Sequence, residues 1–445
     1  MQNAVITPRP WYHALSPQQW NALLASNLGW LFDGYETYAL ILTVGVALHQ
    51  LLDPSQYPGL PAYAGIVIAI TLLGWGIGGM IGGVLADYIG RKRTMILAIL
   101  AYSLMTGLSA LSWDWLSFAV LRFLVGIAIG SEWATGTSIT AELWPDHARG
   151  KGAGLMQCGL GIGFFIASLV WLLVAPLGVG AWRYMYLIGV LPAFATLWIR
   201  RGIPESVLWQ GTNERRRTAL DLKRRGAILD DEDAALARFT LVDLFADPLI
   251  RRRTLIALTM SLTTTLAWWG ISSWVPPYIG ATAAKAGLPA SQWASFAGMA
   301  YNVGAIAGYV GLGFLADALG RKPIVMLFYA MAFVLTPVLF LWTKGLSALL
   351  MVAAANGFFS LGQYTWMSTW LPELYPTRLR ATGVAFVFNA PRFVAFIGPL
   401  IAGTLIVNLG GYGVAATIVG FIYILGFAVT PLLPETRGKA LPNPA

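Results

Sequence analysis

Gly83-Val-Leu-Ala-Asp87-Tyr-Ile-Gly90-Arg91-Lys92 returns 230 residues later as Gly313-Phe-Leu-Ala-Asp317-Ala-Leu-Gly320-Arg321-Lys322. Two further landmarks repeat in the same order. Glu-Leu-Trp-Pro at 142–145 returns as Glu-Leu-Tyr-Pro at 373–376, and Pro-Glu-Ser at 204–206 returns as Pro-Glu-Thr at 434–436. Repeats in one order, at offsets of 230, 231 and 230 residues, predict two copies of one structural unit. Residues that break the match are then the best candidates for chemistry.

The composition predicts an all-α integral membrane protein. Hydrophobic residues make up 57% of the chain, charged residues only 11%, and the mean hydropathy is +0.66. A soluble domain carries about a quarter charged residues, so most of this surface must face lipid. Since a span needs about 20 apolar residues, we expect twelve transmembrane helices near 20–48, 62–86, 94–112, 115–142, 150–175, 182–200, 253–280, 293–316, 324–342, 346–371, 380–407 and 411–433.

These spans divide into two six-helix bundles, over 1–200 and 253–445, joined by a charged linker over 201–252. The linker is expected to be a solvated cytoplasmic segment, and binding of acidic lipid headgroups by its basic clusters is the alternative. Of the 29 Lys and Arg residues, two lie inside spans and three lie in loops opposite the N-terminus, and the others share the side of the N-terminus. By the positive-inside rule both termini are cytoplasmic, in a cell inner membrane. The +9 charge therefore follows the loops and predicts no nucleic-acid partner.

Residues that could build an enzyme site or a metal site are scarce. Cys158 is the single cysteine, and His13, His49 and His147 are far apart in sequence. They offer no metal-ligand spacing and no nucleophile with a base inside the spans. The sequence therefore predicts no metal, no cofactor and no enzymatic activity.

The repeated motif resembles the loop signature of the major facilitator superfamily, and Arg122-x-x-x-Gly126-x-x-x-Gly130 resembles a second motif of that superfamily. The glycines let two helices reverse tightly, and the Asp and Arg can clasp a neighbouring helix end. The resemblance implies two bundles around a central cavity with alternating access, in a monomer. The residues expected to form this gating clasp are Gly83, Asp87, Gly90, Arg91, Asp317, Gly320 and Arg321.

Two further stretches resemble the aromatic-acid and lactate or sialate proton symporters of that superfamily. These are Leu31-Phe32-Asp33-Gly34-Tyr35-Glu36, in which Glu36 replaces the expected Asp, and Gly130-Ser-Glu132-Trp133. The resemblance implies that the partners are a small organic anion and protons. An organic-cation or sugar transporter of the same superfamily is the alternative, in which the acids of the first half would bind the substrate.

Asp33 and Glu36 lie three residues apart near the middle of the first span, so they share a helix face. Charged groups at that depth usually face a cavity or a partner. Two carboxylates this close should not both ionise freely, so one is expected to load and release a proton. The alternative is a tether held by backbone or tyrosine hydrogen bonds.

Arg122 and Glu132 bring charge to the fourth span only, because Ala353 and Gln363 stand at the corresponding positions of the second half. We expect both to take part in proton coupling. Arg122 would either hold a carboxylate of the first span or bond carbonyls of adjacent helices. Glu132 would either relay a proton or anchor the cytoplasmic end of its span.

Arg392 stands at the centre of the eleventh span beside Pro391. A guanidinium at midspan is costly, and its planar fork fits a carboxylate. It is the expected substrate contact, with an ion pair to Asp33 or Glu36 as the compatible alternative. Residues expected to complete the pocket are Tyr35, Gln157, Trp268, Trp269, Tyr301, Asn302, Gln363, Tyr364 and Asn389. The predicted function is proton-coupled uptake of a monocarboxylate or aromatic carboxylate.

Overall fold

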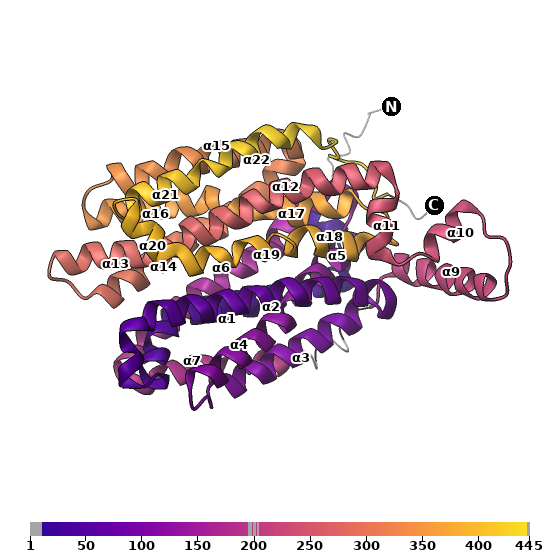
Figure 1. The fold of residues 1–445 in the computed structure, drawn as a ribbon. Coiled ribbons are helices and arrows are strands. Elements are labelled where there is room, and N and C mark those ends of the chain that lie inside the picture. Colours follow the sequence, from indigo (N-terminus) through magenta and orange to yellow (C-terminus); the bar gives the residue numbers. More distant parts are fainter. Residues whose placement is uncertain (1–10, 195–197, 199–201, 203, 443–445) are drawn as a thin grey trace.

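The structure, a computed structural model, describes residues 11–194, 198, 202 and 204–442. It consists of helices that run side by side in two groups, and no strand occurs in these ranges (Figure 1). The first group is α1 (Pro17–Leu51), α2 (Leu60–Ile89), α3 (Arg91–Ser109), α4 (Trp115–Gly130), α5 (Trp133–Leu143), α6 (Arg149–Val174) and α7 (Trp182–Ile188). The second group is α12 (Pro248–Ile271), α13 (Val275–Lys285), α14 (Ala290–Leu319), α15 (Arg321–Pro337), α16 (Leu346–Ser360), α17 (Thr365–Trp370), α18 (Arg380–Asn389), α19 (Arg392–Ala395), α20 (Ile397–Asn408), α21 (Tyr412–Gly420) and α22 (Ile422–Val429).

Ten of the described helical segments are long and apolar enough to cross a membrane, and they match ten of the predicted spans. The predicted span 94–112 is α3, whose first turn carries three cations, yet it packs in the first bundle against α2, α4, α5 and α7. The predicted span 182–200 begins with α7, and its residues 195–197, 199 and 200 lie outside the described residues. The protein is therefore an all-α membrane protein of two bundles.

Several spans that the sequence predicts as continuous helices are interrupted. The fourth span breaks between α4 and α5 at Ser131 and Glu132, and the eleventh breaks between α18 and α19 at Ala390 and Pro391. Pro391 lacks a backbone N–H and so cannot continue the hydrogen-bond ladder. Both breaks lie beside residues that the sequence singles out, and they turn those side chains toward the interior.

The two bundles meet along two helix pairs, α6 with α14 and α2 with α18. Glycines allow the close approach: a Cβ on Gly154 would meet the backbone of α14, and a Cβ on Gly83 would collide with Ala385 of α18. Gly90 and Gly320 have φ values of 107° and 105°, which L side chains rarely adopt. The repeated glycines are therefore required by the turn and by the packing between bundles.

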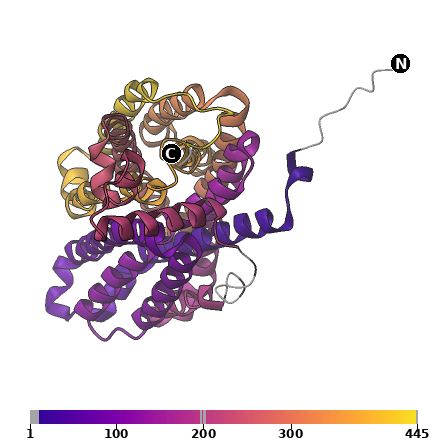
Figure 2. The same cartoon turned by 90° about the vertical axis from the view of Figure 1, so that its right-hand side faces the viewer.

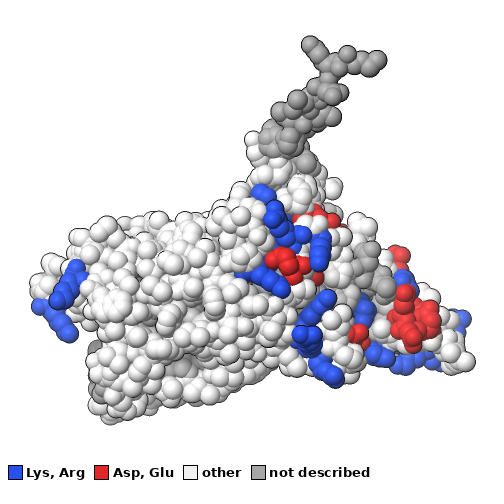
Figure 3. Space-filling model, turned by 90° about the horizontal axis from the view of Figure 1, so that it is seen from above, with Lys and Arg blue, Asp and Glu red and all other residues white. Residues whose placement is uncertain are grey.

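The linker helices α9 (Val207–Arg224), α10 (Asp231–Leu236) and α11 (Thr240–Ala246) lie beyond one end of the bundles, which we call the linker end. Figure 2 looks onto this end and shows the two bundles side by side with a linker helix across them. Charged side chains gather at the linker end, whereas few appear along the body of the protein (Figure 3). The opposite end, which carries the end of α13, is called the far end.

Candidate functional site

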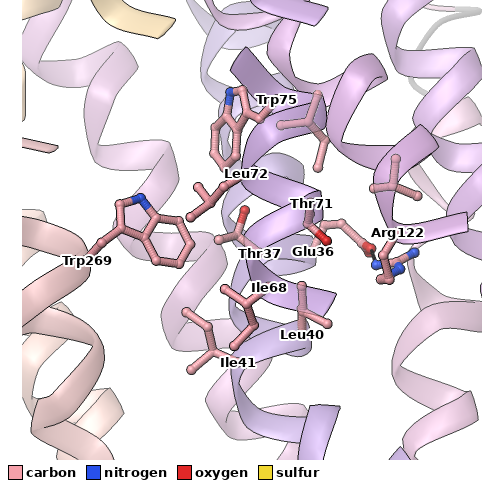
Figure 4. Close-up of a pocket in the computed structure, with 12 residues that line it drawn as sticks. Glu36, Thr37, Leu40, Ile41, Ile68, Thr71, Leu72, Trp75, Arg122 and Trp269 are labelled. Carbon is pink, nitrogen blue, oxygen red and sulfur yellow. Dashed lines mark hydrogen bonds and ion pairs between the residues drawn. The ribbon is translucent and has the colours of Figure 1, made fainter. Parts of the chain in front are cut away.

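Glu36 of α1 and Arg122 of α4 form an ion pair inside the first bundle (Figure 4). The Arg122 guanidinium also donates a hydrogen bond of 2.6 Å to the Ser109 hydroxyl and lies 4.5 Å from the centre of the Tyr186 ring. Both charged side chains are buried. Of the two interpretations of Arg122, the geometry matches a hold on a carboxylate of the first span. Removing either partner would leave a buried charge uncompensated.

Asp33 of α1 lies beside Glu132 at the break between α4 and α5. Both side chains are fully buried, and the Asp33 carboxyl group interacts with that of Glu132 as well as with Glu36. Gly29 stands one turn before Asp33, and a Cβ there would fall on the Glu132 carboxylate. Apart from each other, the two carboxyl groups have no hydrogen-bond partner among the described residues. The site therefore holds two adjacent carboxyl groups with no cation between them.

The carboxylate pair differs from the one that the sequence predicts. Asp33 and Glu36 are expected to act on each other, and they do, but each also has a nearer partner, since three residues of helix separate their directions by about 60°. Glu36 turns to Arg122, and Asp33 faces Glu132. Glu132 meets Asp33 from the break between α4 and α5.

Arg392 is a buried cation whose fork is only partly used. It donates a hydrogen bond to the Phe388 carbonyl, and its guanidinium carbon lies 4.3 Å from the centre of the Trp75 ring and 4.2 Å from that of Phe388. Its Nε has no acceptor, and it forms no ion pair with Asp33, Glu36 or any other acid of the described chain. The ion pair of Arg392 with Asp33 or Glu36, which the sequence offers as the alternative, is therefore absent from this conformation.

Arg392 lines a cavity between the bundles whose wall is mostly aromatic. The residues around it are Trp30, Thr37, Trp75, Leu160 and Phe164 from the first bundle and Trp268, Trp269, Tyr364 and Phe388 from the second. The cavity has about 20 Å³ of space for water-sized molecules. That volume holds about one water molecule, so the site is nearly closed in this conformation.

A second narrow space adjoins the aromatic cavity and reaches Glu36 and Arg122. Trp269 faces α1 and α2 across it from the second bundle (Figure 4). Trp269 also lines a wide groove of about 800 Å³ at the far end, which extends to Ser273 and Tyr412. Ile41 and Ile68 line both spaces as well. These three side chains therefore separate the far-end groove from the interior.

The first copy of the repeated motif closes the linker end across the two bundles. The Asp87 carboxylate accepts hydrogen bonds of 2.9 Å and 2.7 Å from the backbone N–H and the hydroxyl of Thr382, near the start of α18. Arg91 pairs with Asp87 at 3.0 Å and with Glu142 at 3.3 Å, and it donates to the Thr377 carbonyl of the second bundle. The motif thus binds a helix start that belongs to the other half.

The second copy makes the matching contact in the opposite direction. The Asp317 carboxylate accepts hydrogen bonds from the backbone N–H groups of Gly150 at 3.1 Å and Lys151 at 2.9 Å, at the start of α6. Arg321 pairs with Asp317 at 3.0 Å and with Glu373 at 2.7 Å. Because helix starts attract anions, each bundle uses its aspartate to hold the other bundle's helix.

Of the residues predicted for the pocket, Trp268, Trp269, Tyr364 and Arg392 line the aromatic cavity. The others bond to neighbouring side chains or backbone outside its lining. Tyr35 donates to the Met185 carbonyl, Gln157 accepts from Trp133, and Tyr301 bonds to Ser272. Asn302, Gln363 and Asn389 donate to backbone carbonyls three or four residues earlier in the chain. The structure brings this second set to the bundle interior and not to the cavity wall.

Sequence reasoning missed the aromatic contribution of the first bundle. Trp30 lies one turn before Asp33 and so shares its helix face, which was a usable signal. Trp75 stands between Gly74 and Gly76 in a helix that faces the other bundle. A large side chain inside a glycine-rich contact region is a second signal. Phe388 gave none, because it is one aromatic among many in an apolar span.

Known proteins resemble the chain over nearly its whole length. The family model described as "Sugar (and other) transporter" matches residues 23–443. The 3-(3-hydroxy-phenyl)propionate transporter of Escherichia coli is 29% identical over 91% of this chain and 96% of that protein, and the sialic acid transporter NanX of Escherichia coli is 26% identical over 97% of each. The solved structure of the major facilitator superfamily proton:xylose symporter XylE superposes with a TM-score of 0.77 at 21% identity, over 95% of this chain and 98% of that chain.

Proposed function

Because the chain belongs to the sugar (and other) transporter family of the major facilitator superfamily, we propose that it takes up a small organic acid together with protons. The observation that carries this proposal is Arg392, a buried cation without a carboxylate partner that faces a cavity shared by both bundles. A carboxylate would complete the guanidinium fork, and the aromatic wall would cover an apolar or ring-shaped remainder. Two relatives whose names specify an acid, sialic acid and a phenylpropionate, support this substrate class.

The proposed orientation places the linker end and both chain termini on the cytoplasmic side of a bacterial inner membrane. The charged side chains of Figure 3 gather at the linker end, as the positive-inside rule requires of a cytoplasmic face. The far-end groove would then open outward, and the motif contacts would keep the cytoplasmic side closed. This conformation would therefore receive substrate from outside the cell. The transporter is proposed to act as a monomer.

The proton is proposed to reside on the Asp33–Glu132 pair. Adjacent carboxyl groups without a cation cannot both ionise at modest cost, so one of them keeps a proton. The Glu36–Arg122 pair lies within the same bundle and would be the element that responds when the charge of this pair changes. Opening of the linker end would hydrate Asp33 and Glu132 and let the proton leave.

The transport step is proposed to be a rocking of the two bundles around the aromatic cavity. Substrate that enters from the far-end groove would pair with Arg392 and draw Trp269 and the aromatic side chains of both bundles around it. The contacts of Asp87 and Asp317 across the bundles must then break for the linker end to open. Each of these contacts joins parts of two bundles and is therefore available as a conformational lock.

An organic-cation or sugar substrate is the alternative, and the site favours it less. No described carboxylate lines the aromatic cavity, and the Glu36 carboxylate is engaged by Arg122. A cation would therefore meet Arg392 instead of an acid. Uptake into proteoliposomes tests this directly: benzoate-like and lactate-like acids are expected to compete, whereas choline and hexoses are not. Competition by choline or hexoses alone would overturn the proposal.

A further inference from the structure

A groove of about 960 Å³ at the linker end lies between the start of α3 and the linker helix α9. Three cations line it: Lys92 and Arg93 from α3 and Arg217 from α9. None of their side-chain nitrogens has an ion-pair or hydrogen-bond partner among the described residues. Arg93 and Arg217 are exposed. The groove therefore presents three free positive charges from two separate helices.

The two acids in the groove cancel only part of this charge. The Glu205 carboxylate already accepts hydrogen bonds from the backbone N–H groups of Arg91, Lys92 and Ser206 at the start of α3. Glu214 is the remaining acid of the lining. With both carboxylates counted against the three cations, the lining keeps a net charge of +1, so an anion would be attracted to this place.

One wall of the groove is apolar and continues along the lipid-facing side of α3. Ile96 and Leu97 belong to the lining, and Leu97 is 58% exposed. Leu100 and Leu104 continue the same exposed stripe toward the middle of the membrane. A ligand of this groove would therefore contact cations at one end and an apolar surface, suited to an acyl chain, at the other.

The second bundle lacks the same arrangement at the corresponding place. Pro323 stands where the first half has Arg93, at the offset of 230 residues. Lys322, which corresponds to Lys92, donates a hydrogen bond of 3.0 Å to the Pro431 carbonyl. Both halves therefore have the Asp and Arg of the repeated motif. Only the first half has unpaired cations at this position.

We propose that this groove binds one phospholipid with an anionic headgroup. Lys92, Arg93 and Arg217 would bind the headgroup phosphate, whose negative charge no cationic headgroup cancels, and an acyl chain would lie along Ile96 and Leu97. A lipid in this position ties the linker helix to α3. Arg216, next to Arg217, donates to the Asp87 carbonyl at 2.6 Å and to the Arg378 carbonyl at 2.8 Å, so α9 already rests on both bundles. The bound lipid would thus reinforce the closed linker end.

The test measures lipid binding to the purified full-length protein by native mass spectrometry and thermal shift. Phosphatidylglycerol is compared with phosphatidylcholine of the same acyl chains, and wild-type protein is expected to bind phosphatidylglycerol at least tenfold more tightly. The variant Lys92→Gln/Arg93→Gln/Arg217→Gln should lose that preference. The control Lys223→Gln/Arg224→Gln/Arg225→Gln removes the same charge from the end of the same helix, outside the groove lining, and should keep it.

Three outcomes would overturn the proposal. Equal affinity for the two lipids would show that no anionic headgroup is recognised, and a preference retained by the groove variant would place the lipid elsewhere. Competition by inorganic phosphate or glycerophosphoglycerol at the concentration at which phosphatidylglycerol acts would assign the groove to a soluble anion. The single substitution Arg93→Gln, at an exposed side chain, keeps the test valid if the triple variant folds poorly, and it should weaken the preference severalfold.

Discussion

Arg380 of the second bundle holds Glu142 of the first through an ion pair of 2.8 Å in which neither side chain is exposed. Arg91 of the first bundle also reaches Glu142, at 3.3 Å. Glu142 is therefore shared by one arginine from each half. This buried pair forms only while the two bundles are in contact at the linker end. It therefore stabilises the closed conformation relative to one that is open at that end.

Glu142→Gln is expected to shift the protein toward a state open at the linker end. Loss of one partner from a buried ion pair costs about 3–5 kcal/mol, and here that cost falls on the closed conformation. Spin labels at Leu97 and Leu327, the same repeat position in the two halves, would report the separation of the bundles by double electron–electron resonance. A longer-distance population should appear or grow.

The matched control is Asp221→Asn, which removes an acid from the exposed Asp221–Arg225 pair in the linker. Exposed pairs contribute about 0–1 kcal/mol, so the distance distribution should stay as in the wild type. An unchanged distribution for Glu142→Gln would show that this pair does not set the conformational equilibrium.

Arg392→Lys is expected to weaken binding of the transported acid about tenfold to a hundredfold. The substitution keeps the charge but removes the planar fork, and hydrogen bonds to charged groups contribute about 1.5–3 kcal/mol. Isothermal titration calorimetry with a transported acid would measure the change. The control is Arg183→Lys, because Arg183 bonds to the Ala110 and Ser112 carbonyls away from the cavity. Unaltered binding by Arg392→Ala would remove this residue from the site.

The repeat predicted the helical membrane fold and which aspartates and arginines stand at corresponding places in the two halves, because each recurs at a fixed offset. The partners of those residues could not be predicted. Asp87 binds Thr382 and Asp317 binds Gly150, contacts that depend on how the bundles dock. Repetition within the chain specifies a unit but not the surface on which two units meet.

The charged residues of the candidate site were predicted more completely than their pairing. Asp33, Glu36 and Arg122 stand out because charge inside a span is costly. The approach of Glu132 to Asp33 depends on a break in its span that no proline announces. The cavity-facing side of a span that is apolar all round also leaves no periodic signal, and for that reason Phe388 could not be predicted.

Glu36→Gln is expected to destabilise the protein by about 3–5 kcal/mol, because it leaves the Arg122 charge buried without a partner. Arg122→Gln should have a similar effect for the converse reason. The double variant should lose much less than the sum of the two, since it leaves no charge uncompensated. Thermal unfolding in detergent would measure all four proteins. Additive losses would show that the two side chains do not depend on each other.

Glu435→Gln is expected to remove stability at neutral pH but not in acid. Burial acts to raise the pKa of Glu435, yet hydrogen bonds from the backbone N–H groups of Arg321, Lys322, Arg437 and Thr436 outweigh it and hold the pKa below the ordinary value of 4.5. A lowered folded-state pKa gives stability that is present above the unfolded pKa and is lost as the pH falls through the folded value. The Tm difference between the variant and the wild type should therefore shrink below pH 4.5. A constant difference across that range would contradict the role of the charge.

Asp33→Asn is expected to abolish accumulation driven by a pH gradient while substrate counterflow remains measurable. The substitution makes one member of the Asp33–Glu132 pair permanently neutral, so the pair no longer has to keep a shared proton. Glu132→Gln should likewise abolish accumulation driven by a pH gradient and leave counterflow measurable. Glu36→Gln offers a contrast, since its main effect falls on stability through Arg122.

Proteoliposomes that contain a pH-sensitive dye would record proton entry together with substrate entry. Wild-type protein should acidify the lumen when substrate enters, and both pair variants should move substrate without that signal. If wild-type protein moves its substrate with no proton signal and no response to a pH gradient, it is a uniporter or an exchanger, and the two carboxyl groups serve the structure alone.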